Sequence, residues 1–162
     1  MNNIVLNMKL RYLIFLFPVF LFSCKEDNWQ DWKLQNEMWL ESNLSKPGVQ
    51  VTEDSLQYII IYNGIPTDAK PQAGSTIYCD YTLQLINGYQ VDAGHNAAFS
   101  LSNLIPGFVE GVKKIHNQGD IILFIPWTLG YGKDGNGTEG TSGFIPPYST
   151  LIYEIHLSGV AN

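Results

Sequence analysis

The residues of this chain whose types could serve a binding site are mainly aromatic and aliphatic, with few polar groups among them. They are Phe99, Ile105, Phe108, Trp127, Tyr131, Phe144, Ile145 and Tyr153, together with Tyr81 and Asp92. A place in the hydrophobic core explains each apolar member taken singly. Taken together, they could also line a pocket that is mostly apolar and carries a few aimed polar groups. The residue types alone leave both interpretations open.

Motifs for covalent catalysis and for zinc binding are not found. Ser142 lacks the flanking glycines of a nucleophile elbow. The spacing of the three histidines matches no zinc pattern, and Cys79 has no partner at ligand spacing. The other cysteine, Cys24, lies at a candidate processing site near the N-terminus. A disulfide framework is therefore not expected.

The glycine-rich segment 130–143 resembles the start of a calcium loop but fails the pattern. Glu139 stands where that loop needs Gly, and Ile145 stands where it needs Glu. The segment also lacks the Gly-Lys-Ser/Thr ending of a phosphate-binding loop. We interpret it as a flexible surface flap, and the sequence predicts neither a metal site nor a cofactor.

One short helix is predicted over 104–119. Pro106 suits a first helical turn, and Gly119 follows the last periodic residue, where glycine is a common stop signal. Apolar residues form one stripe at helical spacing: Phe108, Val112 and Ile115.

Most other apolar runs indicate strands, at 55–62, 75–86, 89–92, 120–125 and 150–157, with a further short strand around Phe99 and Leu101. Asn87-Gly88 is a strong hairpin signal between the second and third runs. Strands, then one helix, then strands, without a βαβ rhythm, predict an α+β fold. We expect a twisted antiparallel β-sheet wrapped around the one short α-helix.

Composition limits the function classes. The chain has 162 residues, of which 45% are hydrophobic and 15% are charged, which argues against disorder and favours one folded domain. The formal charge of −6 argues against DNA or RNA as a partner, because phosphate binding needs basic patches.

The N-terminal segment 1–23 is predicted to be a signal peptide. Lys9 and Arg11 precede about ten apolar residues, too few for a membrane helix, which needs roughly twenty. The run ends at Ser23-Cys24 and resembles a bacterial lipobox, which implies lipidation of Cys24 and a membrane anchor. A plain secretory signal or a buried apolar segment is the alternative. Lys25-Glu26-Asp27 is either an export signal of surface lipoproteins or a solvated tether.

Residues 24–48 are predicted to form a tether and a short amphipathic helix, which ends before Pro47-Gly48. Trp29, Trp32 and Trp39 lie on this helix at near-helical spacing. The helix could pack on the domain, mediate dimerisation or lie at a membrane surface, and packing on the domain is favoured. The main domain is then 49–162.

Four segments carry a family resemblance. They are Gly-Tyr-Gln-Val-Asp at 88–92, Leu-Ile-Pro-Gly-Phe-Val-Glu-Gly at 104–111, Ile-Pro with Leu-Gly-Tyr-Gly within 125–132, and Ile-Pro-Pro-Tyr-Ser-Thr-Leu at 145–151. In this order they resemble the FKBP-type peptidyl-prolyl cis-trans isomerases. The chain before these segments, with the tryptophan-rich helix and the Leu-Gln-Tyr near residue 57, is similar to that of bacterial FKBP-type lipoproteins, including the macrophage infectivity potentiator group. That family folds as a sheet wrapped around one helix.

The resemblance implies roles for particular residues. Phe108 would form the pocket floor, the Ile105 N–H would receive a substrate carbonyl, Tyr131 would offer a hydroxyl, and Asp92 would orient Tyr81 or meet the rotating carbonyl. The remaining predicted substrate-binding residues are Val91, Phe99, Leu104, Ile145 and Tyr153. The reaction, rotation about an X-Pro bond, needs no cofactor.

Departures from the family pattern keep a second function open. The floor is usually Trp but here is Phe108, Val91 stands where the family has Phe, Tyr153 replaces another Phe, and the flap at 132–144 is longer. We expect an isomerase that acts on proline-containing polypeptides, envelope or secreted proteins, and helps them to fold. The alternative is a weakly catalytic or non-catalytic peptide-binding chaperone. A third reading is a surface lipoprotein whose tryptophan-rich helix recruits a partner. The resemblance also makes macrolide inhibitors candidate ligands.

Overall fold

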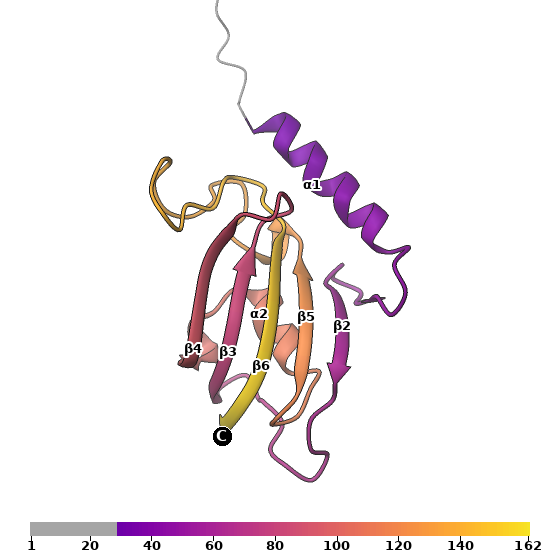
Figure 1. The fold of residues 1–162 in the computed structure, drawn as a ribbon, viewed down its shortest axis with the longest axis vertical. Coiled ribbons are helices and arrows are strands. Elements are labelled where there is room, and N and C mark those ends of the chain that lie inside the picture. Colours follow the sequence, from indigo (N-terminus) through magenta and orange to yellow (C-terminus); the bar gives the residue numbers. More distant parts are fainter. Residues whose placement is uncertain (1–28) are drawn as a thin grey trace, which may run out of the picture.

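The computed structural model describes residues 29–162, so Cys24 and the predicted signal peptide lie outside the described part. Its sheet has six strands, every neighbouring pair antiparallel, in the order β1-β2-β5-β6-β3-β4 (Figure 1). The strands are β1 (Gln50–Val51), β2 (Gln57–Tyr62), β3 (Thr76–Gln84), β4 (Gln90–Ser100), β5 (Asp120–Ile125) and β6 (Leu151–Ala161). The α+β prediction with an antiparallel sheet around one short helix is confirmed.

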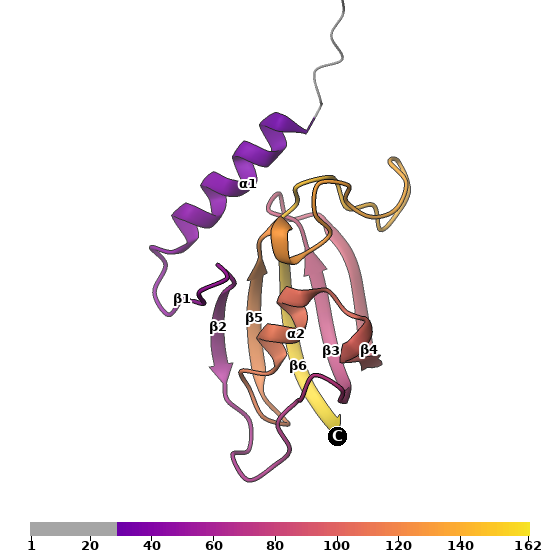
Figure 2. The ribbon, with the colours of Figure 1, turned by 180° about the vertical axis from the view of Figure 1, so that it is seen from behind.

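That helix is α2 (Pro106–Val112), which lies against one face of the sheet (Figure 2). Two of its glycines face β5. A Cβ on Gly107 would lie 2.4 Å from Ile125 Cγ2, and one on Gly111 would lie 2.4 Å from Leu123 Cδ1. Only glycine allows the helix to approach the strand this closely, and the core forms between them.

The predicted helix end is wrong, because α2 stops at Val112 and not before Gly119. Beyond it the chain makes tight turns, in which the N–H of Ile115 reaches the carbonyl of Val112, until β5 begins. Ile115 is nevertheless fully buried. The apolar spacing therefore predicted the burial of Ile115 correctly. The helix nevertheless ends before Ile115, because the chain must turn to enter β5.

The hairpin predicted at Asn87-Gly88 is confirmed, and Gly88 has a φ of 80°. Its return strand is longer than predicted. β4 continues to Ser100 and includes Phe99, which was expected in a separate strand, and Leu101 lies in the 3₁₀ turn η1 (Leu101–Asn103). The pairing shifts between Cys79 and Tyr81, where a bulge containing Asn96 (φ 47°) interrupts the alternation.

The N-terminal helix α1 (Gln30–Asn43) packs on the domain, as favoured from the sequence. Trp39 packs on Phe124 of β5, with ring centroids 5.7 Å apart. The helix residues that are fully buried are polar, Asn36 and Asn43. Within residues 29–162, no helix has the length and apolar character that crossing a membrane requires.

Candidate active site

A cavity of about 170 Å³ lies between the sheet and the segment that leads into α2. It draws its lining from strands β3, β4 and β6, from α2, and from the loop after β5. The lining residues are Tyr81, Asp92, Phe99, Asn103, Leu104, Ile105, Phe108, Tyr131 and Tyr153. The curl of the sheet around α2 therefore brings together residues that are up to 72 positions apart, from Tyr81 to Tyr153.

Four aromatic rings form a closed circuit around this cavity. Phe108 meets Tyr153 edge-to-face at 5.1 Å and Phe99 at 6.2 Å between ring centroids. Tyr81 closes the circuit at 5.4 Å from Phe99 and 6.1 Å from Tyr153. Edge-to-face rings at these distances attract one another, so they hold the apolar walls in place. Phe108 lines the cavity and is buried, with 3% of its surface exposed.

The cavity has few polar groups, and Tyr81 and Asp92 are held by specific hydrogen bonds. The hydroxyl of Tyr81 donates a 2.7 Å hydrogen bond to Oδ2 of Asp92, and the backbone N–H of Ala93 donates to Oδ1 at 2.8 Å. The N–H of Ile105, at the start of α2, donates to no hydrogen-bond acceptor of residues 29–162. It is therefore available to a bound carbonyl.

All three tyrosines of the cavity stay protonated at neutral pH. Burial raises the pKa of Tyr81, and its hydrogen bond to Asp92 raises it further. Burial, followed by the nearby Asp92 charge, raises the pKa of Tyr131. Burial is also the main cause of the raised pKa of Tyr153. The cavity thus offers neutral phenol groups inside an apolar enclosure, which suits a neutral, partly apolar ligand.

Two predicted site residues lie in an adjoining hollow of about 310 Å³ rather than in the ring-lined cavity. Val91 and Ile145 line this hollow, which shares Asp92, Tyr131 and Tyr153 with the cavity. Ile145 exchanges backbone hydrogen bonds of 2.8 and 2.9 Å with Asn136 across the flap. These two residues can therefore contact a ligand only where it extends beyond the cavity.

Other residues singled out from the sequence lie elsewhere. Trp127 packs on Tyr148 at 5.3 Å, and Phe144 packs on Trp29 at 6.0 Å. The Asn103 contribution to the cavity was missed. Its position directly before the Leu-Ile-Pro motif was the one sequence signal for it.

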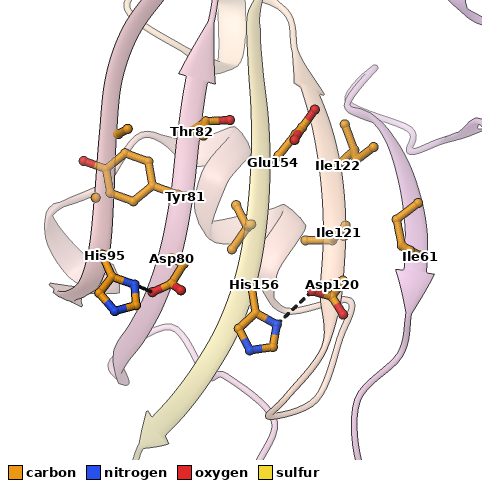
Figure 3. A pocket seen from close by; sticks show the side chains of 13 residues that line it. Ile61, Asp80, Tyr81, Thr82, His95, Asp120, Ile121, Ile122, Glu154 and His156 are labelled. Atoms are coloured by element: carbon orange, nitrogen blue, oxygen red, sulfur yellow. Dashed lines mark hydrogen bonds and ion pairs between the residues drawn. The ribbon is translucent and has the colours of Figure 1, made fainter.

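A larger, open trough of about 720 Å³ lies on the opposite face of the sheet (Figure 3). Both of its histidines are already paired with carboxylates, since His95 Nδ1 lies 2.9 Å from Asp80 Oδ1 and His156 Nδ1 lies 2.8 Å from Asp120 Oδ1. The trough is exposed to solvent and lacks the enclosing rings. The enclosed cavity is therefore the better candidate for chemistry.

Groups that would support metal or thiolate chemistry are not assembled in the described part of the chain. No cluster of three or more His, Cys, Asp or Glu residues within 29–162 could hold a metal ion. Cys79 is a buried free thiol on β3. Burial, followed by the Asp80 charge, raises its pKa to about 11, so it stays protonated.

Comparison with known proteins gives a family match. A family model described as FKBP-type peptidyl-prolyl cis-trans isomerase matches residues 67–158. The outer membrane protein MIP of Legionella longbeachae is 38% identical over 132 residues, which cover 79% of this chain and 54% of that protein. The FKBP-type 22 kDa peptidyl-prolyl cis-trans isomerase of Escherichia coli is 35% identical over 74% of this chain and 56% of its own length. This chain thus spans about half the length of the curated relatives it matches.

Solved structures agree with this match. The FkpA structure from Escherichia coli superposes with a TM-score of 0.73 and 31% identity, over 80% of this chain and 59% of that chain. A peptidyl-prolyl cis-trans isomerase from Pseudomonas syringae superposes with a TM-score of 0.72 and 25% identity, over 82% of this chain and 96% of that chain.

Proposed function

Because this chain belongs to the family of FKBP-type peptidyl-prolyl cis-trans isomerases, we propose that it catalyses rotation about X-Pro peptide bonds. The observation that carries the proposal is the closed circuit of four rings around a cavity of about 170 Å³. The enclosure suits one pyrrolidine ring. The donors that it offers, the Ile105 N–H and the Tyr131 hydroxyl, are neutral and suit carbonyl oxygens.

The reaction makes and breaks no covalent bond. Partial double-bond character of the C–N bond creates a barrier of about 18–20 kcal/mol. A catalyst must bind the twisted amide more tightly than either planar form. The apolar walls exclude water, which stabilises the planar amide by hydrogen bonding to its polarised carbonyl. Phe108 seats the proline ring, and Tyr81, Phe99 and Tyr153 form the walls.

Hydrogen bonds hold the peptide on either side of the proline. The Ile105 N–H donates to one substrate carbonyl, and the Tyr131 hydroxyl donates to another. Asp92 acts through Tyr81, whose hydroxyl it fixes. Leu104 adds an apolar wall beside the cavity. Each such hydrogen bond contributes roughly 1 kcal/mol net, so no single one accounts for catalysis.

The test is a peptide isomerisation assay on the full chain in mild detergent. We expect faster cis-to-trans conversion of a short X-Pro peptide, with a loss of activity in Phe108→Ala. Ile61→Thr, on the opposite face of the sheet, is the control and should keep the wild-type rate. A folded wild-type chain that gives no acceleration rejects the proposal. A macrolide titration in the same assay shows whether such inhibitors compete for the cavity.

A second candidate function is peptide binding with little catalysis. Phe108 offers a smaller floor than the tryptophan usual in the family, and Val91 stands where the family usually has Phe. Both features reduce the aromatic surface that grips proline. Affinity for extended proline-containing peptides without rate enhancement would favour this function, and a rate typical of active relatives would end it.

The proposed location is the bacterial envelope, with 1–23 as a lipoprotein signal peptide, 24–48 as tether and helix, and 49–162 as the isomerase domain. Lipid on Cys24 anchors the chain, so that it acts on envelope or secreted proteins. The lipobox-like ending at Ser23-Cys24 supports this. Labelled palmitate should enter the wild type but not Cys24→Ser, which should also leave the membrane fraction. Equal labelling of both chains contradicts the anchor.

A further inference from the structure

Helix α1 contacts both ends of the loop between β5 and β6, and this loop carries Tyr131 and Ile145. Figures 1 and 2 show α1 crossing the end of the sheet at which β5 ends and β6 begins. The contacts are specific rather than a general apolar packing. They join a helix outside the family match to a loop of the candidate active site.

The first set of contacts fixes the end of the loop that leads into β6. Asn36 is fully buried, and its Oδ1 accepts a 2.7 Å hydrogen bond from the N–H of Thr150. One helical turn earlier, Trp32 Nε1 donates a 2.9 Å hydrogen bond to Oγ of Ser149. That hydroxyl in turn donates to the carbonyl of Pro146 at 2.7 Å. Residues 146–150 are therefore held by two side chains of α1.

The second set of contacts reaches the other end of the loop. The Lys33 ammonium lies 5.7 Å from the ring centroid of Trp127 and 5.5 Å from that of Tyr148. Cations at these distances are attracted to aromatic faces. The Tyr148 N–H donates to the carbonyl of Gly132 at 3.0 Å, directly after Tyr131. α1 thus lies over the point where the two ends of the loop meet.

Backbone strain at this point needs external support. Tyr148 has a φ of 61°, in the left-handed region that bulky residues avoid. Such a conformation persists only when the surrounding structure fixes it. The two residues that follow Tyr148 are the ones that α1 hydrogen-bonds.

We propose that α1 is a positioning element for the proline site, in which Asn36 and Trp32 fix the loop that carries Tyr131 and Ile145. This inference rests on the proposed isomerase function. Tyr131 and Ile145 hold the flanking peptide, whereas the proline seat, Phe108, lies on α2 and not on the loop. Loosening α1 should therefore weaken substrate binding more than turnover.

α1 provides a matched control. Asn43 is as fully buried as Asn36 and lies on the same helix, but its Nδ2 donates to Oε1 of Gln57 on β2 at 2.9 Å, away from the loop. Asn36→Leu and Asn43→Leu are the same change in the same helix. Both should lower the melting temperature. We expect only Asn36→Leu to raise KM severalfold while kcat stays within twofold in the full chain.

Trp32→Phe is the second variant, because it keeps an aromatic ring of smaller size and removes the donor to Ser149. It should raise KM in the same direction and by less. Equal KM changes in Asn36→Leu and Asn43→Leu, or no KM change in Asn36→Leu and Trp32→Phe, would overturn the positioning role.

If the wild type shows no isomerase activity, the proposed function fails, but hydrogen exchange still tests this inference. Faster exchange at the Asn136 and Tyr148 amides in Asn36→Leu, and not in Asn43→Leu, supports it, and equal exchange overturns it.

Discussion

The Tyr81 hydroxyl and the Asp92 carboxylate share a 2.7 Å hydrogen bond between neighbouring strands of one hairpin. The other carboxylate oxygen accepts the N–H of Ala93. Each oxygen of Asp92 thus accepts a hydrogen bond from within the protein. From the sequence, Asp92 could orient Tyr81 or meet the rotating carbonyl, and this geometry supports the first role.

The first prediction is a double-mutant cycle on this pair. Tyr81→Phe and Asp92→Ala should each lower kcat/KM by about three- to tenfold, the equivalent of roughly 1 kcal/mol for one hydrogen bond. If Asp92 acts through Tyr81, the double variant should lose no more than the worse single variant. Kinetics on one X-Pro peptide would measure this. Fully additive losses would show instead that Asp92 acts on the substrate independently.

Sequence reasoning succeeded where the signal is local. Asn87-Gly88 defines its hairpin because a tight turn between strands needs residues that tolerate positive φ, and the run of apolar residues at 120–125 matches β5. The family resemblance predicted Tyr81, Asp92 and Tyr131 as site residues, and the fold places them around one cavity. Their proposed roles stay predictions.

Sequence reasoning failed where tertiary structure decides. Ile115 fits the helical stripe but is buried from a turn, so periodicity could not locate the end of α2. The small and polar residues of β4 carry a weak strand signal, and pairing with β3 organises them. Asn36 looks like an ordinary polar helix residue, because only the fold brings Thr150 to it.

The second prediction concerns Gly94, which lies opposite Tyr81 in the β3–β4 pairing. A Cβ at this position would lie 2.5 Å from Cε1 of Tyr81, so Gly94→Ala must displace the ring. The displaced hydroxyl would lose its alignment with Asp92. We expect kcat/KM to fall by about threefold or more, as for loss of one hydrogen bond. Gly74→Ala, with nothing within 4 Å of its new Cβ, is the control and should match wild type. A wild-type rate in Gly94→Ala would contradict the prediction.

The third prediction tests the floor of the cavity. Phe108→Trp restores the larger ring usual in the family, and position 108 lines the cavity of about 170 Å³. A larger aromatic surface should grip proline better and raise kcat/KM severalfold. Phe108→Ala, by contrast, should cost about 3–5 kcal/mol of stability, because it empties a buried site. Thermal melting separates misfolding from a kinetic effect. A well-folded Phe108→Trp with lower activity would show that the phenylalanine is the better fit here.

The fourth prediction concerns acid stability and Asp80 on the outer face of the sheet (Figure 3). The Asn96 N–H, which donates to Oδ1 at 2.7 Å, is the main cause of a pKa below the ordinary value of 3.8, and the hydrogen bond with His95 adds to it. Because the folded-state pKa is the lower one, the charge of Asp80 stabilises the fold above pH 3.8. This contribution disappears as the pH falls through the folded-state pKa.

Urea unfolding of wild type and Asp80→Asn across this pH range measures the effect. Asparagine keeps an oxygen that can accept the Asn96 N–H but removes the charge, so the comparison isolates ionisation. The wild type should be the more stable chain at pH 6, and the difference should shrink as the pH falls below 3.8. A difference that is the same at pH 6 and at pH 2 would mean that packing, and not the charge of Asp80, stabilises this bulge.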